Sequence, residues 1–453
     1  MKFKHLLRPL HLTAIMFFTV SGGPYGLEPL LHSVGSTLAV VLILVTPLVW
    51  SLPVILVVLE LNGIMPQEGG YYQWVKSALG RSWGFCEGWW SWLYAMTDLA
   101  IYPVLFVQYI SFFFPQIAPY SVAICLGMVW LCTLLNLKGI LPVGRSSLIL
   151  GVFVIAPFVV MAIVGMTSHP NPGTVRQGLG TTFSMAALCM GLFNVMWNYL
   201  GWDNGFTIAE EVRSPVRAYP IAIAGAMVLI AGTYLVSMLT GIRFGIDPQL
   251  FEENGFPALG AQVGGWWLGS IVAAGGMASA LGLFLAGLLA ISRVPNVMSD
   301  DGYLPRFLRA RHPVTQMPTA AILTCAVVTS CMVVWSFGEL LVIDVTLYTA
   351  ALMPEFAALI ALRRRAPNIP RPFRVPLGSG GLIGLTALPV ICIGIALSGL
   401  VATGTVNAVA AWVALLAVAS GPAIWLLLRR SGRPLPSGSS APERTVEESY
   451  EGK

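Results

Sequence analysis

Four carboxylates lie within long apolar stretches of the chain, at Asp98, Asp203, Asp344 and Glu355. A charged side chain at the depth of a bilayer is costly and is usually functional. No Lys or Arg lies at comparable depth in these stretches, so the acids have no evident basic partner. Such acids can hold a proton, accept hydrogen bonds from open backbone, or bind a cationic ligand. Their types and positions therefore indicate chemistry on protons or ammonium groups.

An interruption in the first apolar stretch reads FFTVSGGPYGLE, at residues 17–28. Its glycines weaken a helix, and Pro24 removes a backbone donor. Irregular backbone at membrane depth persists only where it lines a polar cavity or is covered by protein. N–H groups near 24–26 suit a carboxylate, and carbonyls near 21–22 suit an ammonium or a small cation. The candidate ligand-binding residues here are Ser21, Gly22, Gly23 and Gly26.

A second interruption, NYLGWDNG at residues 198–205, contains Asp203. Gly/Pro interruptions at corresponding places in two halves of a membrane protein indicate a transporter's binding site. A simple kink is the alternative, because Gly and Pro are common in membrane helices. Asp203 could also cap the half-helix that follows it, and Trp202 could cover a bound cation or only pack in the interior.

The remaining acids have weaker interpretations. Glu28 follows Pro24, where compensation of a helix dipole explains it as well as a gating role does. Glu60, Glu87 and Glu210 lie near the ends of apolar stretches, and we expect them to be solvated or paired at a gate. Asp344 is expected to reach an outer aqueous vestibule. The candidates for a gate or for dipole compensation are Glu28 and Glu210. The candidates for proton coupling or amine contact are Asp98, Asp203 and Glu355. The substrate-binding candidates also include Trp202, Asp203 and Tyr348.

The composition requires a membrane. Charged residues make up 10% of the 453 positions and hydrophobic residues 56%, and the mean hydropathy is +0.78. Soluble proteins carry about 25% charged residues, so a set of soluble domains is excluded. The net charge of +5 reflects orientation in a bilayer rather than a nucleic-acid partner, as the positions of the basic residues show below.

Other classes of protein lack support in the sequence. The seven cysteines show no C-x-x-C spacing and the five histidines no ligand pattern, so we expect neither a metal site nor a cofactor. No nucleophile–base set lies at depth, and the chain is not expected to be an enzyme. A channel filter motif and an attached signalling domain are also missing. No pattern specifies an oligomeric state.

Hydrophobic segments predict an all-α membrane protein with twelve transmembrane helices. Residues 1–430 form a single transporter domain, in which about 10–166 and 185–362 are inverted repeats that open on the two interruptions, with two extra helices over about 379–428. Residues 431–453, rich in Ser, Pro and Glu, are expected to be a disordered cytoplasmic tail. The twelve segments run roughly over 10–31, 35–62, 84–114, 120–137, 145–166, 185–211, 218–243, 264–298, 317–337, 339–362, 379–402 and 406–428.

The basic residues predict the orientation. With twelve spans and the N-terminus in the cytoplasm, all of the 25 Lys and Arg residues except Arg176 and Arg243 fall on the cytoplasmic side. The first apolar stretch has no A-x-A cleavage site, so we interpret it as a retained helix rather than a signal peptide. An integral multi-pass protein of the plasma (inner) membrane is expected, with both termini in the cytoplasm.

Several segments together resemble the amino acid–polyamine–organocation (APC) superfamily, in particular its polyamine-uptake and L-type amino acid transporter branch. The similarity extends over nearly the whole chain, and the residues that carry it are Ser21–Gly26 with Glu28, Tyr102–Phe106 with Asp98, Gly151–Phe153, Pro157–Met161, Trp202–Asp203 with Glu210–Val212, Leu347–Tyr348 with Glu355–Phe356, and Arg371–Pro376. This resemblance implies the leucine-transporter-type fold, with a 5+5 inverted repeat and broken helices 1 and 6. It also implies import driven by a cation, usually H⁺, with Asp203, Tyr348 and Glu355 around the substrate.

Two departures from that pattern matter. Plant-type polyamine members carry Glu two residues before the serine of the first interruption, where this chain has Thr19. The fifth span lacks the lysine that some proton-coupled relatives use, so proton coupling would need a carboxylate. Sodium remains an alternative, because carbonyls near Ser21 and the hydroxyl of Ser279 could form a weak ion site. The sequence thus predicts a proton-coupled, alternating-access importer of polyamines or related amines, or alternatively an amino acid permease or exchanger.

Overall fold

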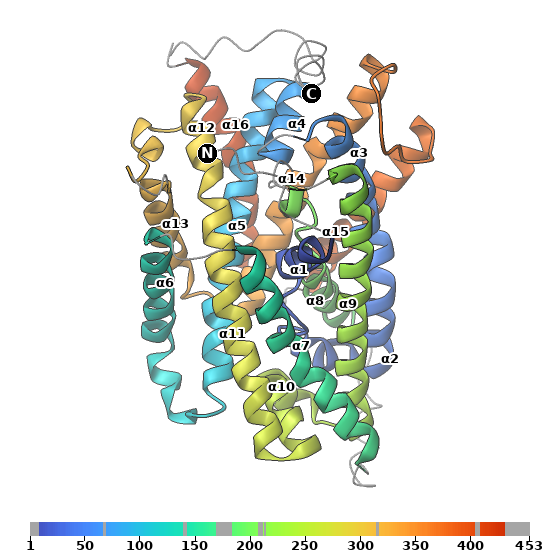
Figure 1. Ribbon diagram of the computed structural model, residues 1–453, viewed down its shortest axis with the longest axis vertical. Helices are drawn as coiled ribbons and strands as arrows, with labels where there is room; N and C mark the ends of the chain where they lie inside the picture. Colours follow the sequence, from blue (N-terminus) through green and yellow to red (C-terminus); the bar gives the residue numbers. More distant parts are fainter. Residues whose placement is uncertain are drawn as a thin grey trace.

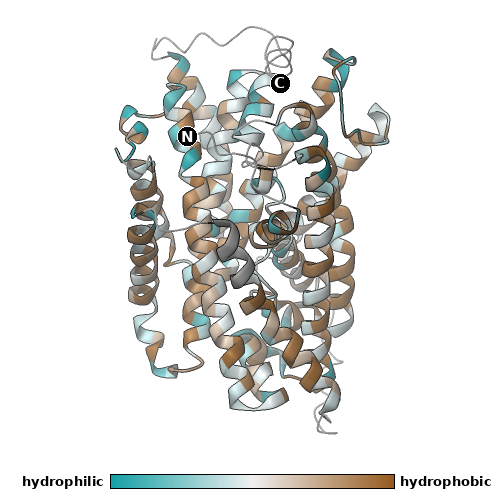
Figure 2. Cartoon of the chain, in the orientation of Figure 1, coloured by the Kyte–Doolittle hydropathy of each residue, from teal (hydrophilic) through white to brown (hydrophobic). Residues whose placement is uncertain are grey.

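The protein is a bundle of helices that stand side by side (Figure 1). Apolar residues occupy much of the length of the helices, and hydrophilic residues gather toward the two ends (Figure 2). The computed structural model describes residues 9–66, 69–138, 143–168, 184–206, 212, 214–313, 317–403 and 408–430.

Nine helical segments in these ranges are long and apolar enough to cross a bilayer, which agrees with an all-α membrane protein. They are α2 with η1 and α3 (Glu28–Thr46, Pro47–Ser51, Leu52–Ile64), α5 (Arg81–Ile110), η2 with α6 (Pro115–Tyr120, Ser121–Leu137), α7 (Val143–Thr167), α9 (Pro215–Phe244), α11 with α12 (Trp266–Ile291, Arg293–Asp300), α14 (Phe337–Arg365), α15 (Ser379–Thr403) and α16 (Ala408–Arg430). Three shorter apolar helices are α1 (Pro9–Val20), α8 (Met185–Asn198) and α13 (Thr319–Met332). The count of twelve spans and the inverted repeat stay predictions.

Both predicted interruptions are confirmed. The first break, residues 21–27, separates the end of α1 from the start of α2, and the second break, residues 199–206, follows the end of α8. Gly22, Gly26 and Gly201 have φ angles of 63°, 92° and 90°. Residues with a Cβ rarely adopt such angles, so these glycines permit the breaks.

Helix α2 covers two of the predicted segments. Its backbone leaves helical geometry at Gly35, where φ is 72° and ψ is 174°. Residues 28–34 therefore form a short outer helix that belongs with α1, and the longer part from residue 36 begins the next predicted span. The kink lies between the predicted segments 10–31 and 35–62.

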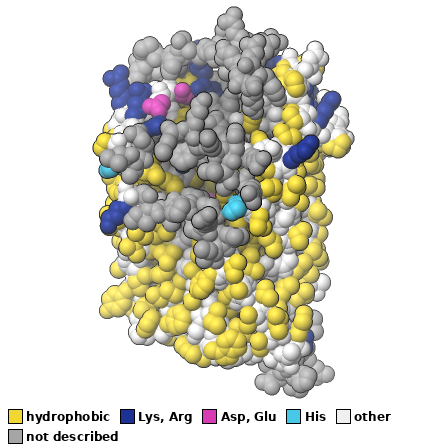
Figure 3. Space-filling model, in the orientation of Figure 1, with side chains coloured by type: hydrophobic (Ala, Val, Ile, Leu, Met, Phe, Trp, Pro, Cys, Tyr) yellow, Lys and Arg dark blue, Asp and Glu magenta, His cyan; other side chains and the backbone are white. Residues whose placement is uncertain are grey.

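Two helices occupy stretches that the sequence indicated only as connections. Helix α4 (Gly70–Leu79) and helix α10 (Pro248–Gly264) lie at opposite ends of the bundle (Figure 1). Helix α10 starts at Asp247, whose carboxylate accepts hydrogen bonds from the N–H groups of Gln249 and Leu250, both at 3.0 Å. On the face shown in Figure 3, most Lys and Arg side chains lie in the upper half of the view, toward the α4 end. Arg243, one of the two basic residues predicted outside, precedes α10.

A buried ion-pair cluster joins three segments at the α4 end. Glu60 of α3 is fully buried and accepts hydrogen bonds from Arg363 of α14 at 2.8 and 2.5 Å. Arg371 Nε lies 3.4 Å from Glu60 Oε1, and the N–H of Val375 donates to Glu60 Oε2 at 2.8 Å. This buried ion-pair cluster, Glu60 with Arg363 and Arg371, fixes the segment after α14 against α3 and α14. Glu60 is therefore paired and not solvated, which is one of the two alternatives that the sequence left open.

Substitution of Glu60 tests the cluster. Glu60→Gln leaves two buried guanidinium groups without their shared carboxylate, and breaking a buried pair typically costs about 3–5 kcal/mol. We expect a clear fall in the thermal unfolding midpoint of the detergent-solubilised protein. The matched control is Glu253→Gln, on the exposed surface of α10, which should melt with the wild type. A Glu60→Gln protein that also melts with the wild type would show that the cluster adds no stability.

Candidate functional site

The two breaks lie against each other within the bundle. A Cβ on Gly201 would come within 2.9 Å of the carbonyl oxygen of Thr19, so glycine is needed at this contact. Tyr234 of α9 connects the two segments, because its hydroxyl donates to the Asn198 carbonyl oxygen (2.7 Å) and lies 2.6 Å from Ser21 Oγ. The two predicted interruptions therefore form one structural unit.

The backbone N–H groups of the first break are largely bound within the chain. Gly26 N donates to Glu28 Oε2 at 2.6 Å, and Gly23 N donates to Ser21 Oγ at 3.0 Å. Gly22 N donates to a carbonyl in the last turn of α1 at 3.2 Å. We expected N–H groups in this segment to be open to a ligand carboxylate, and in this conformation those three already have acceptors.

Glu28 holds the outer part of this unit together. Its side chain is fully buried, and it accepts hydrogen bonds from the Tyr109 hydroxyl of α5 (2.9 Å) and from the N–H of Phe256 in α10 (3.3 Å). A Cβ on Gly255 would approach Glu28 Oε1 to 3.0 Å, and Gly255 has a φ of 67°. Glu28 thus connects three elements, which dipole compensation alone does not explain. Glu210, the other acid predicted at a gate, lies outside the described residues.

The carbonyl oxygens of the first break also have a partner. Ser279 of α11 donates from its hydroxyl to the Gly22 carbonyl oxygen at 2.5 Å. The two groups that the sequence indicated for a weak sodium site do lie together. Their mutual hydrogen bond would have to open before a cation could bind there.

A small polar cavity lies beside the two breaks. It holds about 20 Å³, which is room for about one water molecule. Trp197 of α8 donates from Nε1 to Asp98 Oδ1 at 3.0 Å, and the Tyr102 hydroxyl donates to the other carboxylate oxygen. The cavity therefore combines an acid with an indole, and this lining includes no basic residue. The lining residues are Thr19, Val20, Ser21, Asp98, Tyr102, Trp197, Asn198, Leu200, Asn204 and Leu283.

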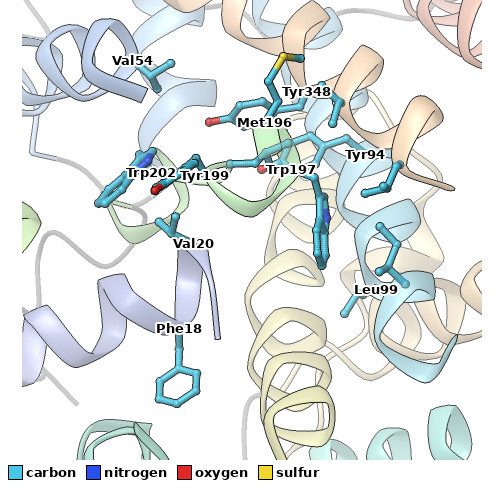
Figure 4. Close-up of a cluster of buried hydrophobic side chains, with 14 of the residues drawn as sticks. Phe18, Val20, Val54, Tyr94, Leu99, Met196, Trp197, Tyr199, Trp202 and Tyr348 are labelled. Carbon is cyan, nitrogen blue, oxygen red and sulfur yellow. The ribbon is translucent and has the colours of Figure 1, made fainter. Parts of the chain in front are cut away.

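The indole at the cavity is not the one that the sequence indicated. Trp202 is 1% exposed and does not line the cavity. Figure 4 shows it near Val20 and Val54, across the break from Trp197. Sequence reasoning missed Trp197, although its place immediately before the second interruption was a usable signal. A role for Trp202 in substrate contact stays a prediction.

Asp203 is held by α14. The Tyr348 hydroxyl donates to Asp203 Oδ1 at 2.6 Å and accepts a hydrogen bond from Gly201 N at 3.3 Å. The Tyr94 hydroxyl of α5 donates to Asn204 Oδ1 at 2.8 Å, and the rings of Tyr94 and Tyr348 are 5.1 Å apart. The structure thus brings Asp203 and Tyr348 together, as the predicted set required.

The other acids of the bundle interior are less exposed than we expected. Glu355 is 1% exposed, and Asp344 and Glu87 are fully buried. Glu355 lies within electrostatic range of Asp203 and Glu87, and Asp344 within range of Asp98. The expectation of an aqueous vestibule for Asp344 is wrong in this conformation, and Glu87 is not solvated. Neighbouring helices cover both side chains, which the position of a residue along one helix does not reveal.

Comparison with known proteins decides the family. A sequence profile described as amino acid permease matches residues 7–425. The chain belongs to this family. It is therefore a member of the APC superfamily, a multi-pass membrane transporter and not an enzyme, as the resemblance in the sequence implied.

Named relatives of this permease are transporters of amines. It is 36% identical to a probable polyamine transporter of Arabidopsis thaliana, over 84% of this chain and 79% of that protein. It is 34% identical to the polyamine transporter PUT1 of Oryza sativa subsp. japonica, over 85% and 72% of the two chains. It is 26% identical to the probable agmatine/putrescine antiporter AguD of Lactococcus lactis, over 76% and 78%.

The geometry of the first break makes a prediction about Gly22. In Gly22→Ala, the new Cβ would collide with the Leu283 side chain and come within 2.9 Å of Ser279 Oγ, at a φ of 63° that costs a residue with a Cβ about 1–2 kcal/mol. We expect transport by the reconstituted permease to be lost. Gly127→Ala is the matched control, because a Cβ on this glycine of α6 meets nothing within 4 Å. If Gly22→Ala transports as well as Gly127→Ala, close packing at the first break is not required for transport.

Proposed function

We propose that this permease is a secondary active transporter that imports polyamines or related amine-bearing metabolites by proton symport with alternating access. The observation that carries the proposal is the contrast between the two kinds of group at the breaks. N–H groups that could receive a carboxylate are bound by the chain itself, whereas the cavity offers an acid and an aromatic ring. That combination favours a ligand with ammonium groups and no carboxylate.

The electrostatics of the cavity support an ammonium ligand. A buried ammonium group needs a carboxylate partner, because transfer of an unpaired charge out of water is costly. Asp98 supplies one at the cavity, and Trp197 beside it can add a cation–π contact. Asp203, held by Tyr348, offers a second carboxylate nearby for a ligand with two amines. The names of the relatives, which refer to polyamines, agmatine and putrescine, agree with this class.

Thr19 lines the cavity at the position where plant-type polyamine members carry an acid. Its hydroxyl donates to the Ile15 carbonyl oxygen within α1 at 2.8 Å, so it brings no charge to the site. Because this site has one anionic group fewer than the site of the plant-type members, we propose that its substrates include amines shorter than polyamines. The alternative is an amino acid permease or exchanger, which the description of the family favours. A zwitterionic substrate would have to displace the Glu28 carboxylate from Gly26.

The proposed coupling ion is the proton. The acids of the bundle, Asp98, Asp203 and Glu355, provide proton-binding groups, and the fifth predicted span contains no Lys. Sodium at the first break would require the bond between Ser279 and Gly22 to open. A cavity of about 20 Å³ is far smaller than a polyamine, so substrate entry requires the helices to separate. Alternating access supplies that movement.

We also propose the placement of the protein in the cell. Insertion in the plasma membrane with both termini in the cytoplasm puts the α4 end inside and the α10 end outside. Basic residues at the α4 end, such as Lys76 and Arg365, and the single predicted basic residue near α10, Arg243, support this orientation. Twelve spans and a 5+5 inverted repeat complete the proposal.

Uptake by purified protein in liposomes tests the substrate. We expect saturable uptake of labelled putrescine and spermidine that increases with an inwardly directed proton gradient and does not require sodium. Leucine serves as a zwitterionic competitor, and arginine as an amino acid that also carries a cationic side chain. If labelled leucine is taken up and labelled putrescine is not, the amino acid alternative replaces the leading proposal. Uptake that follows sodium but not protons would overturn the proposed ion.

Asp203→Asn tests the second carboxylate. It keeps the shape of the side chain and an acceptor for the Tyr348 hydroxyl, but it removes the negative charge offered to an amine. We expect uptake to be abolished while the unfolding midpoint of the protein is retained. If the variant transports at the wild-type rate, Asp203 has only a role in shaping the second break.

A further inference from the structure

Two neighbouring helices carry matching sets of acids and tyrosines. In α5, Tyr94 and Asp98 follow Glu87 by seven and eleven residues, and in α14 Tyr348 and Glu355 follow Asp344 by four and eleven. Residues four, seven and eleven apart share one face of an α-helix. When the two helices run in opposite directions, the order acid–tyrosine–acid is the same in both. The seven-residue intervals, from Glu87 to Tyr94 and from Tyr348 to Glu355, then lie at the same end.

The structure aligns these two faces. The rings of Tyr94 and Tyr348 are 5.1 Å apart, Glu355 lies within electrostatic range of Glu87, and Asp344 lies within range of Asp98. The seam between α5 and α14 therefore contains an outer acid pair, Asp98 with Asp344, and an inner acid pair, Glu87 with Glu355. Eleven residues of helix separate the two pairs along the seam by ~16 Å.

The carboxylates of the inner acid pair have few hydrogen-bond partners. Ser91 donates to Glu87 Oε1 at 2.8 Å. Glu87 Oε2 and both carboxylate oxygens of Glu355 have no hydrogen-bond partner in the part of the chain that the structure describes. Both side chains are at most 1% exposed. Neither lines the cavity beside the breaks, so an amine docked there would not reach them directly.

The groups that face the inner pair are acidic or neutral. Asp203 of the second break and Tyr71 of α4 lie within electrostatic range of both glutamates, and Tyr348 lies within range of Glu355. No Lys or Arg within the described ranges forms an ion pair with either glutamate, in contrast to Glu60. Two neighbouring carboxylates without a cationic partner repel each other when both are ionised, so such a pair is suited to bind a proton.

We propose that Glu87 and Glu355 together form the proton-binding site of the transport cycle. This inference rests on the proposed proton-coupled transport and adds Glu87 and the shared site to it. A protonated pair permits the close packing of α5 and α14 at this end, whereas a doubly ionised pair repels. Loss of the proton to the cytoplasm therefore accompanies separation of the inner ends of the two helices. Asp203, which accepts a hydrogen bond from Tyr348, lies within electrostatic range of both glutamates.

The test separates exchange of substrate from movement of protons. Glu87→Gln and Glu355→Gln each replace an acid by a neutral side chain of the same shape, and Glu253→Gln on the surface of α10 is the control. Counterflow of labelled putrescine without a pH gradient measures exchange, and a pH-sensitive dye trapped in the liposomes measures proton flux. We expect Glu87→Gln to retain exchange and both variants to lose the proton flux that accompanies putrescine uptake, because a neutral amide cannot take up the transported proton.

The outcomes distinguish failure of the shared proton-binding site from failure of the proposed function on which it rests. Wild-type protein that exchanges no amine overturns the proposed function. Wild-type protein that exchanges putrescine without moving protons overturns the inference and leaves the substrate assignment intact. A wild-type flux ratio in either variant overturns the shared site. Because loss of exchange could reflect misfolding, unfolding midpoints are measured in parallel, and a folded Glu87→Gln protein that has lost exchange also overturns the proposed role.

Discussion

The carboxylate of Glu28 satisfies backbone that the first helix break leaves open, and much of the site depends on this contact. Its bond to Gly26 N at 2.6 Å occupies a donor that could otherwise attract an anionic ligand. Its contacts with Tyr109 and Phe256 fix the outer helix of residues 28–34 against α5 and α10. The Glu28 carboxylate thus occupies a position at this break that the carboxylate of a ligand would otherwise take.

The positions of the breaks could be read from the sequence because they depend on local backbone chemistry. Gly22, Gly26 and Gly201 occupy φ angles that glycine tolerates, and Pro24 removes a donor wherever it stands. Tyr348 beside Asp203 followed from resemblance rather than from spacing. The placement of Trp202 away from the cavity did not follow, because side-chain direction in a non-helical segment depends on its actual dihedral angles and not on the helical period.

The depth of an acid was the property that sequence position described least well. Glu87 lies six residues into α5, where a helix end predicts access to water, but Tyr71 of α4 and Glu355 of α14 lie nearby and its exposure is nil. Burial here depends on segments distant in the chain. The matched spacing of acids and tyrosines in α5 and α14 was nevertheless present in the sequence, and it becomes informative once the two helices are known to be antiparallel neighbours.

The structure contains two kinds of buried glutamate, and their difference separates structural charge from charge that can change. Glu60 is fully buried between two guanidinium groups and a backbone N–H, so its carboxylate is paired within the fold. Glu87 and Glu355 are equally buried, but both lie within electrostatic range of Asp203, and no basic residue in the described ranges forms an ion pair with either. An acid with fixed basic partners holds a helix in place through the whole cycle. An acid without a basic partner can gain or lose a proton when water or a cation reaches it, and in the proposed mechanism this change signals the state of the site.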